Sequence, residues 1–288
     1  MVVSFGGRYL AVDWGTTNRR TYLIEDGAVV SSERDDRGVT SVTDFEIEVA
    51  ALRERHGDLP MLLAGMVGSN VGWRAAPYAQ APAGFAELVA KLLWIDDRTA
   101  IVPGIATHND VMRGEEVQLL GAVAARLTPA NALLCQPGTH CKWAEMAGGR
   151  VAGFTTAMTG ELFALLRGHG LLASQLGSEV TPGTAFLEGV EEGKKRDLAA
   201  SLFGIRAAGI LGKRDDADAA SYASGLLIGS EVAARLAGSA HDIVHILSGP
   251  ELGALYVAAI EAHGRAAILI DSHAAFAAGI VAIESHIR

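Results

Sequence analysis

A pattern of three short strands joined by two turns occurs twice in the chain. The first copy reads "YLAVDW", a "GTTN" turn, "RRTYLIE", a "DG" turn and "AVVSSER"; the second reads "ALLCQ", "PGTH", "CKWAEM", a "GG" turn and "RVAGFTT". Apolar, β-branched runs bounded by such turns predict antiparallel hairpins. Gly15 and Gly138 lie 123 residues apart. A repeat at this scale predicts two similar domains and excludes a short-period solenoid.

The first turn of each copy has residues suited to holding phosphate. Glycine lets the backbone approach a ligand closely, and threonine hydroxyls and successive N–H groups offer donors to phosphate oxygens. Asp13, at the end of the first strand, is a candidate Mg²⁺ ligand. Two ordinary hairpins are the alternative, but the duplication favours a phosphate clamp. The candidate phosphate-binding residues are Gly15, Thr16, Thr17, Asn18, Gly138, Thr139, His140 and Lys142.

The composition is that of a globular protein and argues against membrane and nucleic-acid-binding proteins. The chain has 288 residues, enough for two cores, and half of them are hydrophobic, as in globular proteins. A net charge of −9 argues against a nucleic-acid surface. The sequence has neither an apolar run long enough for a membrane span nor the features of a signal peptide, and two cysteines are too few for a disulfide scaffold. We therefore expect a reduced cytoplasmic protein without membrane or nucleic-acid partners.

The rest of the sequence alternates between helical and strand patterns, which is typical of an α/β protein with mixed sheets. Helices are predicted over 83–94, 115–127, 160–172, 221–238, 251–264 and 273–286, and strands over 242–249 and 266–270.

Five motifs, "GTTNRR", "GMVGSNVGWRAAPY", "PGIATHNDVMRGEEVQLLGA", "PGTHCKW" and "MTGELFALL", together resemble the 2-dehydro-3-deoxygalactonokinase family. That family lies within the actin/hexokinase/Hsp70 ATPase superfamily. The resemblance implies two duplicated RNase H-like domains around an interdomain nucleotide cleft. It further implies phosphorylation of 2-dehydro-3-deoxy-D-galactonate by ATP, with Mg²⁺, on the terminal 6-hydroxyl during galactonate and galactose catabolism. The sequence leaves the oligomeric state open, and a homodimer is one possibility.

On this resemblance we expect a substrate-side domain at residues 1–112 plus 273–288 and a nucleotide-side domain at 113–272. Two residues depart from the family pattern. Arg19 stands where we expect an aromatic residue, and Cys141 where we expect serine. In this interpretation Arg19 adds a cation near the cleft.

Phosphoryl transfer to a hydroxyl needs a base, and Asp110 in "THNDVMRGEE" is the candidate. It follows the predicted strand end "AIVPG" and precedes a predicted helix. Its place in the sequence between the two hairpins resembles that of the base in hexokinase-type kinases. The alternative is that Asn109 or Asp110 caps the helix. Glu115 and Glu116 are rival carboxylates.

An anionic substrate requires an arginine or backbone donors for its carboxylate. Arg20, Arg74 and Arg113 are the candidates, and the glycine-rich segment "GMVGSNVGW" suits a pocket wall. In "LSGPELGALY", Gly249 and Pro250 are expected beside the adenosine. The full set of predicted substrate-binding residues is Arg20, Gly68, Ser69, Asn70, Trp73, Arg74, Asn109 and Arg113.

Two alternatives to this activity stay open at the level of sequence. One is a kinase for another sugar acid or a neutral sugar, and the other is a regulatory ATPase of the actin type. The sequence does not distinguish the C4 epimers of the acid.

Overall fold

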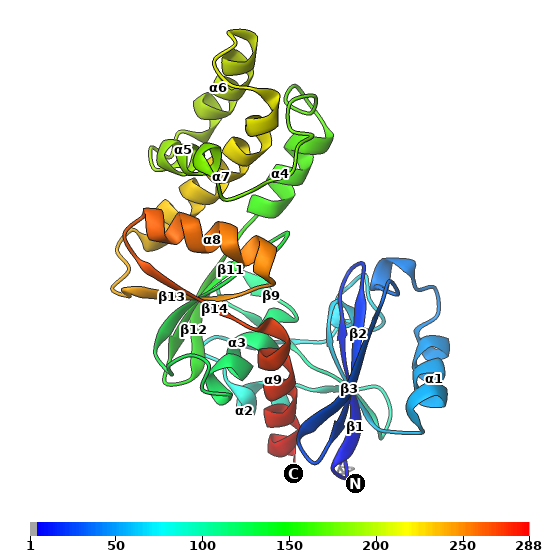
Figure 1. Cartoon of the computed structure of the whole chain (residues 1–288). Coiled ribbons are helices and arrows are strands. Elements are labelled where there is room, and N and C mark those ends of the chain that lie inside the picture. Colours follow the sequence, from blue (N-terminus) through cyan, green and yellow to red (C-terminus); the bar gives the residue numbers. More distant parts are fainter. Residues whose placement is uncertain (1–4, 288) are drawn as a thin grey trace. The chain divides into compact units, whose positions relative to one another are not determined.

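The computed structural model describes residues 5–287 (Figure 1). The N-terminal segment used for the signal-peptide expectation therefore lies partly outside the described residues. The chain divides into two compact units. Unit 1 comprises Met1–Asn131, Glu145–Phe154 and Ser272–Arg288, and unit 2 comprises Ala132–Ala144 and Thr155–Asp271.

Unit 1 is built on a mixed sheet with the strand order β3-β2-β1-β4-β7-β6. The predicted hairpins form its antiparallel half, and β4 and β7 run parallel to β1. A smaller sheet has the order β5-β8-β9. The strands are β1 (Arg8–Trp14), β2 (Arg19–Glu25), β3 (Ala28–Asp35), β4 (Met61–Gly65), β5 (Tyr78–Gln80), β6 (Leu93–Trp94), β7 (Thr99–Ile101), β8 (Gly104–Ala106) and β9 (Val111–Met112).

Alternation along β1 decides which side chains reach the core of unit 1. Leu10, Val12 and Trp14 are fully buried in one cluster with Val49 and Leu52 of α1. Asp13 therefore points to the opposite face of the sheet. The helices of this unit are α1 (Phe45–His56), α2 (Phe85–Val89), α3 (Glu115–Ala124) and α9 (Ser272–Ile287), with 3₁₀ turns η1 (Val39–Ser41) and η2 (Met66–Gly68).

The second sheet repeats this topology, with the strand order β12-β11-β10-β13-β14; residues 145–154 of β11 and β12 belong to unit 1 and the rest of the sheet to unit 2. As in the sheet of unit 1, a three-strand meander is followed by a parallel strand that pairs with its first strand and by a second parallel strand beyond that one. The duplicated α/β fold predicted from the repeat is thus confirmed. The strands are β10 (Ala132–Gln136), β11 (Cys141–Ala147), β12 (Arg150–Ala157), β13 (Ile243–Leu247) and β14 (Ala266–Ile270).

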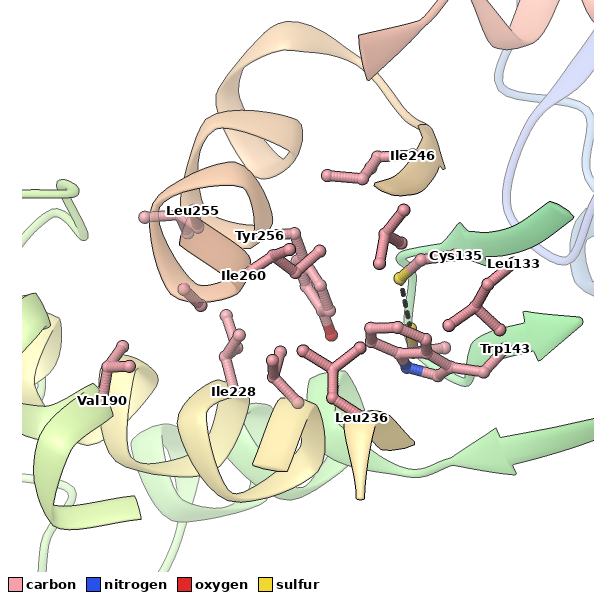
Figure 2. Close-up of a cluster of buried hydrophobic side chains, with 14 of the residues drawn as sticks. Leu133, Cys135, Trp143, Val190, Ile228, Leu236, Ile246, Leu255, Tyr256 and Ile260 are labelled. Atoms are coloured by element: carbon pink, nitrogen blue, oxygen red, sulfur yellow. Dashed lines mark hydrogen bonds between the residues drawn. The ribbon is translucent and has the colours of Figure 1, made fainter. Parts of the chain in front are cut away.

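The core of unit 2 joins its sheet to the long helix α7 and to α8 (Figure 2). Trp143, Ile228 and Tyr256 are buried there beside Cys135 and Cys141, whose sulfur atoms lie 3.6 Å apart. The helices of this unit are α4 (Thr159–Gly168), α5 (Thr184–Gly193), α6 (Leu198–Ile210), α7 (Asp216–Leu236) and α8 (Pro250–Ala262).

One predicted element is wrong in extent. The helix expected over 83–94 ends after five residues, and the chain then forms β6, in which Leu93 and Trp94 pair with β7. Pairing of β6 with β7, which itself pairs with the more distant β4, thus overrides the local helical pattern. The strand predicted at 266–270 has those bounds, and the helices predicted at 115–127, 160–172, 221–238, 251–264 and 273–286 are present with shifted ends.

The predicted domain boundary at residue 113 stays a prediction; helix α3 belongs to unit 1. Within residues 5–287, no helix combines the length and the apolar composition needed to cross a membrane.

Candidate functional site

A cavity of about 310 Å³ opens in unit 1 at the carboxyl end of β1. It brings together several residues that the sequence singled out, and adds two that it did not, Arg34 and His273. The cavity is lined by Asp13, Gly15, Thr16, Thr17, Asn18, Arg19, Arg20, Arg34 and His273.

The turn between β1 and β2 is held in place by the segment that follows β3. Val39 N–H donates to the carbonyl of Gly15, and Thr40 donates to the carbonyl of Thr16 from both its N–H and its hydroxyl. A Cβ at Gly38 would lie 2.3 Å from a backbone atom of Thr17. The turn carbonyls are therefore occupied, while the Thr16 and Thr17 side chains stay exposed.

Asp13 is the acidic group of this cavity. It is half-buried and pairs across the sheet with Arg20. Burial raises the pKa of its carboxyl to about 6; the nearby charge of Glu115 adds to the rise and Arg20 opposes it. A divalent cation would relieve the penalty of ionising a buried carboxylate.

Asp13 fits the role of a Mg²⁺ ligand in a nucleotide site. Such sites use one or two carboxylates and take the remaining ligands from phosphates and water. Over the described part of the chain, no group of three His, Cys, Asp or Glu side chains could hold a metal by itself. A Mg²⁺ at Asp13 would therefore arrive with its phosphates.

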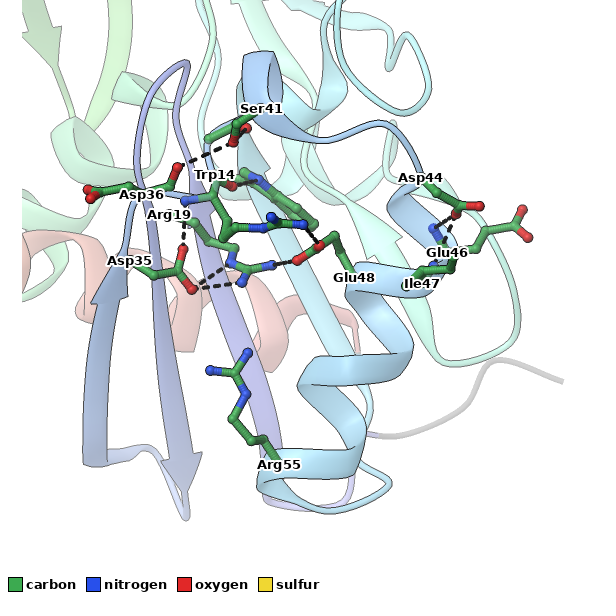
Figure 3. A network of polar contacts seen from close by, with 12 residues as sticks. Trp14, Arg19, Asp35, Asp36, Ser41, Asp44, Glu46, Ile47, Glu48 and Arg55 are labelled. Carbon is green, nitrogen blue, oxygen red and sulfur yellow. Dashed lines mark hydrogen bonds and ion pairs between the residues drawn. The ribbon is translucent and has the colours of Figure 1, made fainter.

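Arg19 does not add a cation to the cavity, which corrects the expectation from the sequence. The residue is 2% exposed, and its guanidinium donates to Asp35 Oδ2 at 2.7 Å and to Glu48 Oε2 at 2.9 Å (Figure 3). It also lies 5.0 Å from the centre of the Trp14 ring. Burial raises the pKa of Glu48, but hydrogen bonds from Arg37 and Arg19 outweigh it and hold that pKa below its ordinary value. Arg19 is thus part of the packed interior of unit 1.

In unit 2 the corresponding turn packs on the start of α4. Glu161 N–H donates to the carbonyl of Thr139 at 3.0 Å, and a Cβ at Gly160 would lie 2.4 Å from the carbonyl oxygen of Gly138. His140 Nε2 lies 2.5 Å from Glu161 Oε2. Lys142 is buried, and its ammonium donates to the carbonyl of His140 at 3.1 Å.

Cys141, the second departure from the family pattern, is fully buried in the core. Burial raises the pKa of its thiol.

The segment expected beside the adenosine has the predicted strand–glycine–helix form. β13 ends at Leu247, Gly249 is the N-cap of α8, and Pro250 is its first residue. Both Gly249 and Pro250 are exposed, and a Cβ at Gly249 would meet no atom within 4 Å.

The glycine-rich segment at residues 66–76 folds back on itself. Within it, the backbone N–H groups of Ser69, Gly72, Trp73, Arg74 and Ala76 all donate to carbonyls. The Ser69 hydroxyl accepts a further bond from Val71 N–H. The Trp73 ring stacks on Phe45, with 6.2 Å between ring centres. Asn70 and Arg74 are exposed.

Arg113 lies against this segment. Its Nη2 donates to the carbonyl of Ala76 at 2.8 Å, and the guanidinium covers the Tyr78 ring at 4.3 Å. Its Nε and Nη1 are buried without a hydrogen-bond acceptor. Gly68 is adjacent, because a Cβ there would lie 2.9 Å from Nη1.

Asp110 lies in the turn between β8 and β9. It is half-buried, its Oδ1 accepts from Val111 N–H at 2.8 Å, and its carbonyl accepts from Thr107 N–H at 2.9 Å. The alternative that Asn109 or Asp110 caps the next helix is wrong, because α3 begins at Glu115 with Gly114 as its N-cap. Asn109 is exposed.

The rival carboxylates Glu115 and Glu116 are engaged at the start of α3. Glu115 accepts from Arg113 N–H, and both oxygens of Glu116 accept from Gly114 N–H. Burial raises the pKa of Glu116 to about 8, with a further contribution from the charge of Glu115.

A family model described as 2-keto-3-deoxy-galactonokinase matches residues 13–283. The chain belongs to this family. It is 38% identical over 287 residues to the 2-dehydro-3-deoxygalactonokinase of Escherichia coli K12, covering 96% of this chain and 97% of the relative. Membership of the family assigns the chain to the ATP-dependent sugar kinases.

Two solved structures place the fold. A crystal structure of a protein from Sinorhizobium meliloti, titled a putative 2-dehydro-3-deoxygalactonokinase, matches with a TM-score of 0.90 and 38% identity, over 96% of this chain and 97% of that one. Component A of the (R)-2-hydroxyglutaryl-CoA dehydratase of Acidaminococcus fermentans matches with a TM-score of 0.56 at 11% identity, over 98% of this chain and 99% of that one. The second likeness concerns the fold alone.

Proposed function

We propose that the protein transfers the γ-phosphoryl group of ATP to the terminal 6-hydroxyl of 2-dehydro-3-deoxy-D-galactonate. The observation that carries this proposal is the unit 1 cavity, which combines a phosphate-type turn, the carboxylate of Asp13 and the cation of Arg20. Membership of the 2-keto-3-deoxy-galactonokinase family supports the choice of substrate.

In this proposal the two glycine-threonine turns bind the phosphates of ATP, and Asp13 holds Mg²⁺. Residues 15–18 supply donors from unit 1. Gly138, Thr139, His140 and Lys142 supply them from unit 2. Gly249 and Pro250 contact the adenosine, and the open space at Gly249 is consistent with a ligand beside it.

For the substrate carboxylate, our order of preference is Arg20, then Arg113, then Arg74. Arg20 lines the cavity. Arg113 has two buried donors without an acceptor, and an unsatisfied buried donor costs free energy that a bound carboxylate would recover. Most of the N–H groups in residues 66–76 are used within the segment, which weakens the alternative of a purely backbone carboxylate site. Gly68, Ser69, Asn70, Trp73 and Asn109 complete the proposed substrate site.

Asp110 is the proposed base that accepts the proton of the 6-hydroxyl. Its carboxylate is anchored through one oxygen, which limits its freedom and favours a fixed orientation toward an acceptor. Asp110→Asn is therefore expected to lower kcat by about 10²–10⁴-fold, the usual cost of losing a general base. The Kd for a non-hydrolysable ATP analogue should change little.

His108, two residues before Asp110 in the same turn, provides a matched control. His108→Ala alters the same turn without removing a carboxylate, and it should retain most of the wild-type kcat. An Asp110→Asn variant with wild-type turnover would remove Asp110 from the mechanism.

The substrate is tested by a panel of acceptors. ADP release should depend on 2-keto-3-deoxy sugar acids, including both C4 epimers, and should be slow with neutral hexoses. Equal rates with neutral sugars would favour the neutral-sugar alternative. ADP release that needs no acceptor would favour a regulatory ATPase.

A further inference from the structure

Two arginines face each other on neighbouring strands at the rim of the unit 1 cavity. The β1–β2 register pairs Asp13 with Arg20, and the β2–β3 register pairs Arg20 with Arg34. Directly opposed residues share one face of a sheet, so the three side chains form a row across it. All three line the cavity.

A β-bulge creates this pairing. Counted from the "DG" turn, a regular hairpin would place Glu33 opposite Arg20 and would form a cross-strand ion pair. The register instead shifts between Leu23 and Ile24, which leaves Val30 as the extra residue and brings Arg34 opposite Arg20. Bulges of this kind re-aim side chains near functional sites. The shift therefore exchanges an expected ion pair for two like charges.

Neither guanidinium is held by a hydrogen bond from the surrounding protein. Among the residues that the structure describes, neither Arg20 nor Arg34 makes a hydrogen bond or an ion pair, in contrast to Arg8 on the same sheet, which pairs with Glu25 at 2.7 Å. Like charges directly opposite each other destabilise a sheet. A bound anion would turn this repulsion into attraction.

His273 lies beside the two arginines, at the start of α9. Its Nδ1 is 3.3 Å from the hydroxyl of Tyr22, which lies two residues beyond Arg20 on β2 and so on the same face. Tyr22 is in turn stacked on Phe276 of α9, with 5.2 Å between ring centres. The imidazole is thereby fixed at the edge of the cavity.

We propose that Arg20 and Arg34 together form an oxyanion site, with His273 at its edge, and that Arg34 is a binding determinant of this kinase. The ligand group is a carboxylate or a phosphate. The identity of its carrier, the sugar acid or ATP, rests on the function proposed above. Two guanidinium groups offer forked donors to such a group, a geometry that lysine does not reproduce.

The test compares Arg34→Met with Arg8→Met, which removes the same charge from the same sheet but from an ion pair. Arg34→Met should raise the KM for one ligand by about 10- to 150-fold, equivalent to ~1.5–3 kcal/mol at 1.4 kcal/mol per decade. A rise in KM for the sugar acid assigns the site to the carboxylate, and a rise in KM for ATP assigns it to a phosphate. Arg34→Lys should recover only part of the loss, and Arg8→Met should leave both KM values unchanged.

A second measurement is independent of catalysis. In low salt without ligand, Arg34→Met should melt at a higher temperature than the wild type, because the repulsion with Arg20 is gone, whereas Arg8→Met should melt at the same or a lower temperature. Inorganic phosphate should stabilise the wild type more than Arg34→Met. Failure of the wild type to phosphorylate the sugar acid would defeat the proposed function but not this result. Unchanged KM values together with equal stabilisation by phosphate would overturn the oxyanion site.

Discussion

The two hairpins of this kinase share a scaffold and differ in their chemistry. In both units a glycine-threonine turn joins the first two strands of a meander, and the segment after the third strand donates N–H groups to the turn carbonyls. In both, a glycine in that segment permits the close approach: Gly38 in unit 1 and Gly160 in unit 2. The contacts that shape the turn are therefore duplicated.

The residues around the turns are not duplicated. At the offset of 123 that relates Gly15 to Gly138, Asp13 corresponds to Gln136, Arg19 to Lys142 and Arg20 to Trp143. Trp143 is buried in the core (Figure 2). Its indole N–H donates to Glu231 Oε1 at 2.5 Å. The positions that present the Asp13 carboxylate and the Arg20 guanidinium to the unit 1 cavity thus hold an amide and a buried aromatic side chain in unit 2. The two turns therefore share their supporting contacts, whereas Asp13 and Arg20 beside the unit 1 turn have no ionisable counterpart at the equivalent positions of unit 2.

The sharpest test of this asymmetry is Asp13→Asn against Gln136→Ala. Loss of the proposed metal ligand should lower kcat by about 10²–10³-fold, because the cation stabilises the charge of the transferred phosphoryl group. Gln136→Ala should lower kcat by less than about 10-fold. Steady-state kinetics over a range of Mg²⁺ concentrations separates the two, and equal losses would show that the hairpins contribute equally.

Asp13 also predicts a pH dependence. With a pKa of about 6, its carboxyl must lose a proton to bind Mg²⁺, so kcat/KM for MgATP should fall below about pH 6 in the wild type. Because burial raises this pKa from 3.8, the folded state favours the protonated form, and stability is lost as the pH rises through about 6. Without Mg²⁺, Asp13→Asn should therefore be more stable than the wild type at pH 8 and nearly equal at pH 4. A gain that is the same at both pH values would contradict this origin.

The next largest effect concerns the buried cations at the equivalent positions, Arg19 and Lys142. Arg19→Met would leave Asp35 and Glu48 without their shared partner and should lower the free energy of unfolding by about 3 kcal/mol, the low end for a buried pair. The loss of stability is expected at the low end of that range because Glu48 keeps its ion pair with Arg37 and the Asp35 side chain is 28% exposed. Lys142→Met should cost less stability. Denaturant titration measures both, and a larger loss for Lys142→Met would reverse this ranking.

The sequence was sufficient for the scaffold. Strand alternation and the "DG" and "GG" turns are local signals, and they predicted both meanders and the duplication. The sequence was insufficient where residues far apart in the chain decide whether a segment forms a strand or whether a side chain is buried. β6 replaced the end of a predicted helix because it pairs with β7, a strand that is held in the sheet by β4, more than 30 residues earlier in the chain. Arg19 became a core residue because Glu48, 29 residues away on α1, reaches it.

The site was predicted only in part for the same reason. Asp13, Arg20 and residues 15–18 were found because they lie within one short motif, and the structure brings them to one cavity. Arg34 was missed because a regular hairpin places Glu33 at that position, and nothing in the local sequence marks the bulge at Val30. His273 was missed because it reaches the cavity from the other end of the chain.

The shared part of the scaffold is tested by alanine at the packing glycines. Gly38→Ala and Gly160→Ala would each place a Cβ within 2.5 Å of backbone atoms, so each should cost about 1–3 kcal/mol of stability by overpacking. Gly138→Ala is the matched control, because a Cβ there meets no atom within 4 Å. Thermal unfolding should rank the control above both variants. If only one of the two were destabilised, the turns would not be supported alike.

The smallest expected effect concerns the turn hydroxyls. Thr16 and Thr139 are both exposed and occupy the same position after the turn glycine, so each can donate one hydrogen bond to a phosphate oxygen. Replacing either by alanine removes one donor, worth about 0.5–1.5 kcal/mol, and should raise the Kd for ATP by roughly 2- to 12-fold. Calorimetric titration with an ATP analogue measures this change. Similar losses would support a duplicated phosphate function. A loss confined to Thr16→Ala would mean that the unit 2 turn keeps the shape of its counterpart without its ligand, and unchanged affinity in both would remove the hydroxyls from the phosphate site.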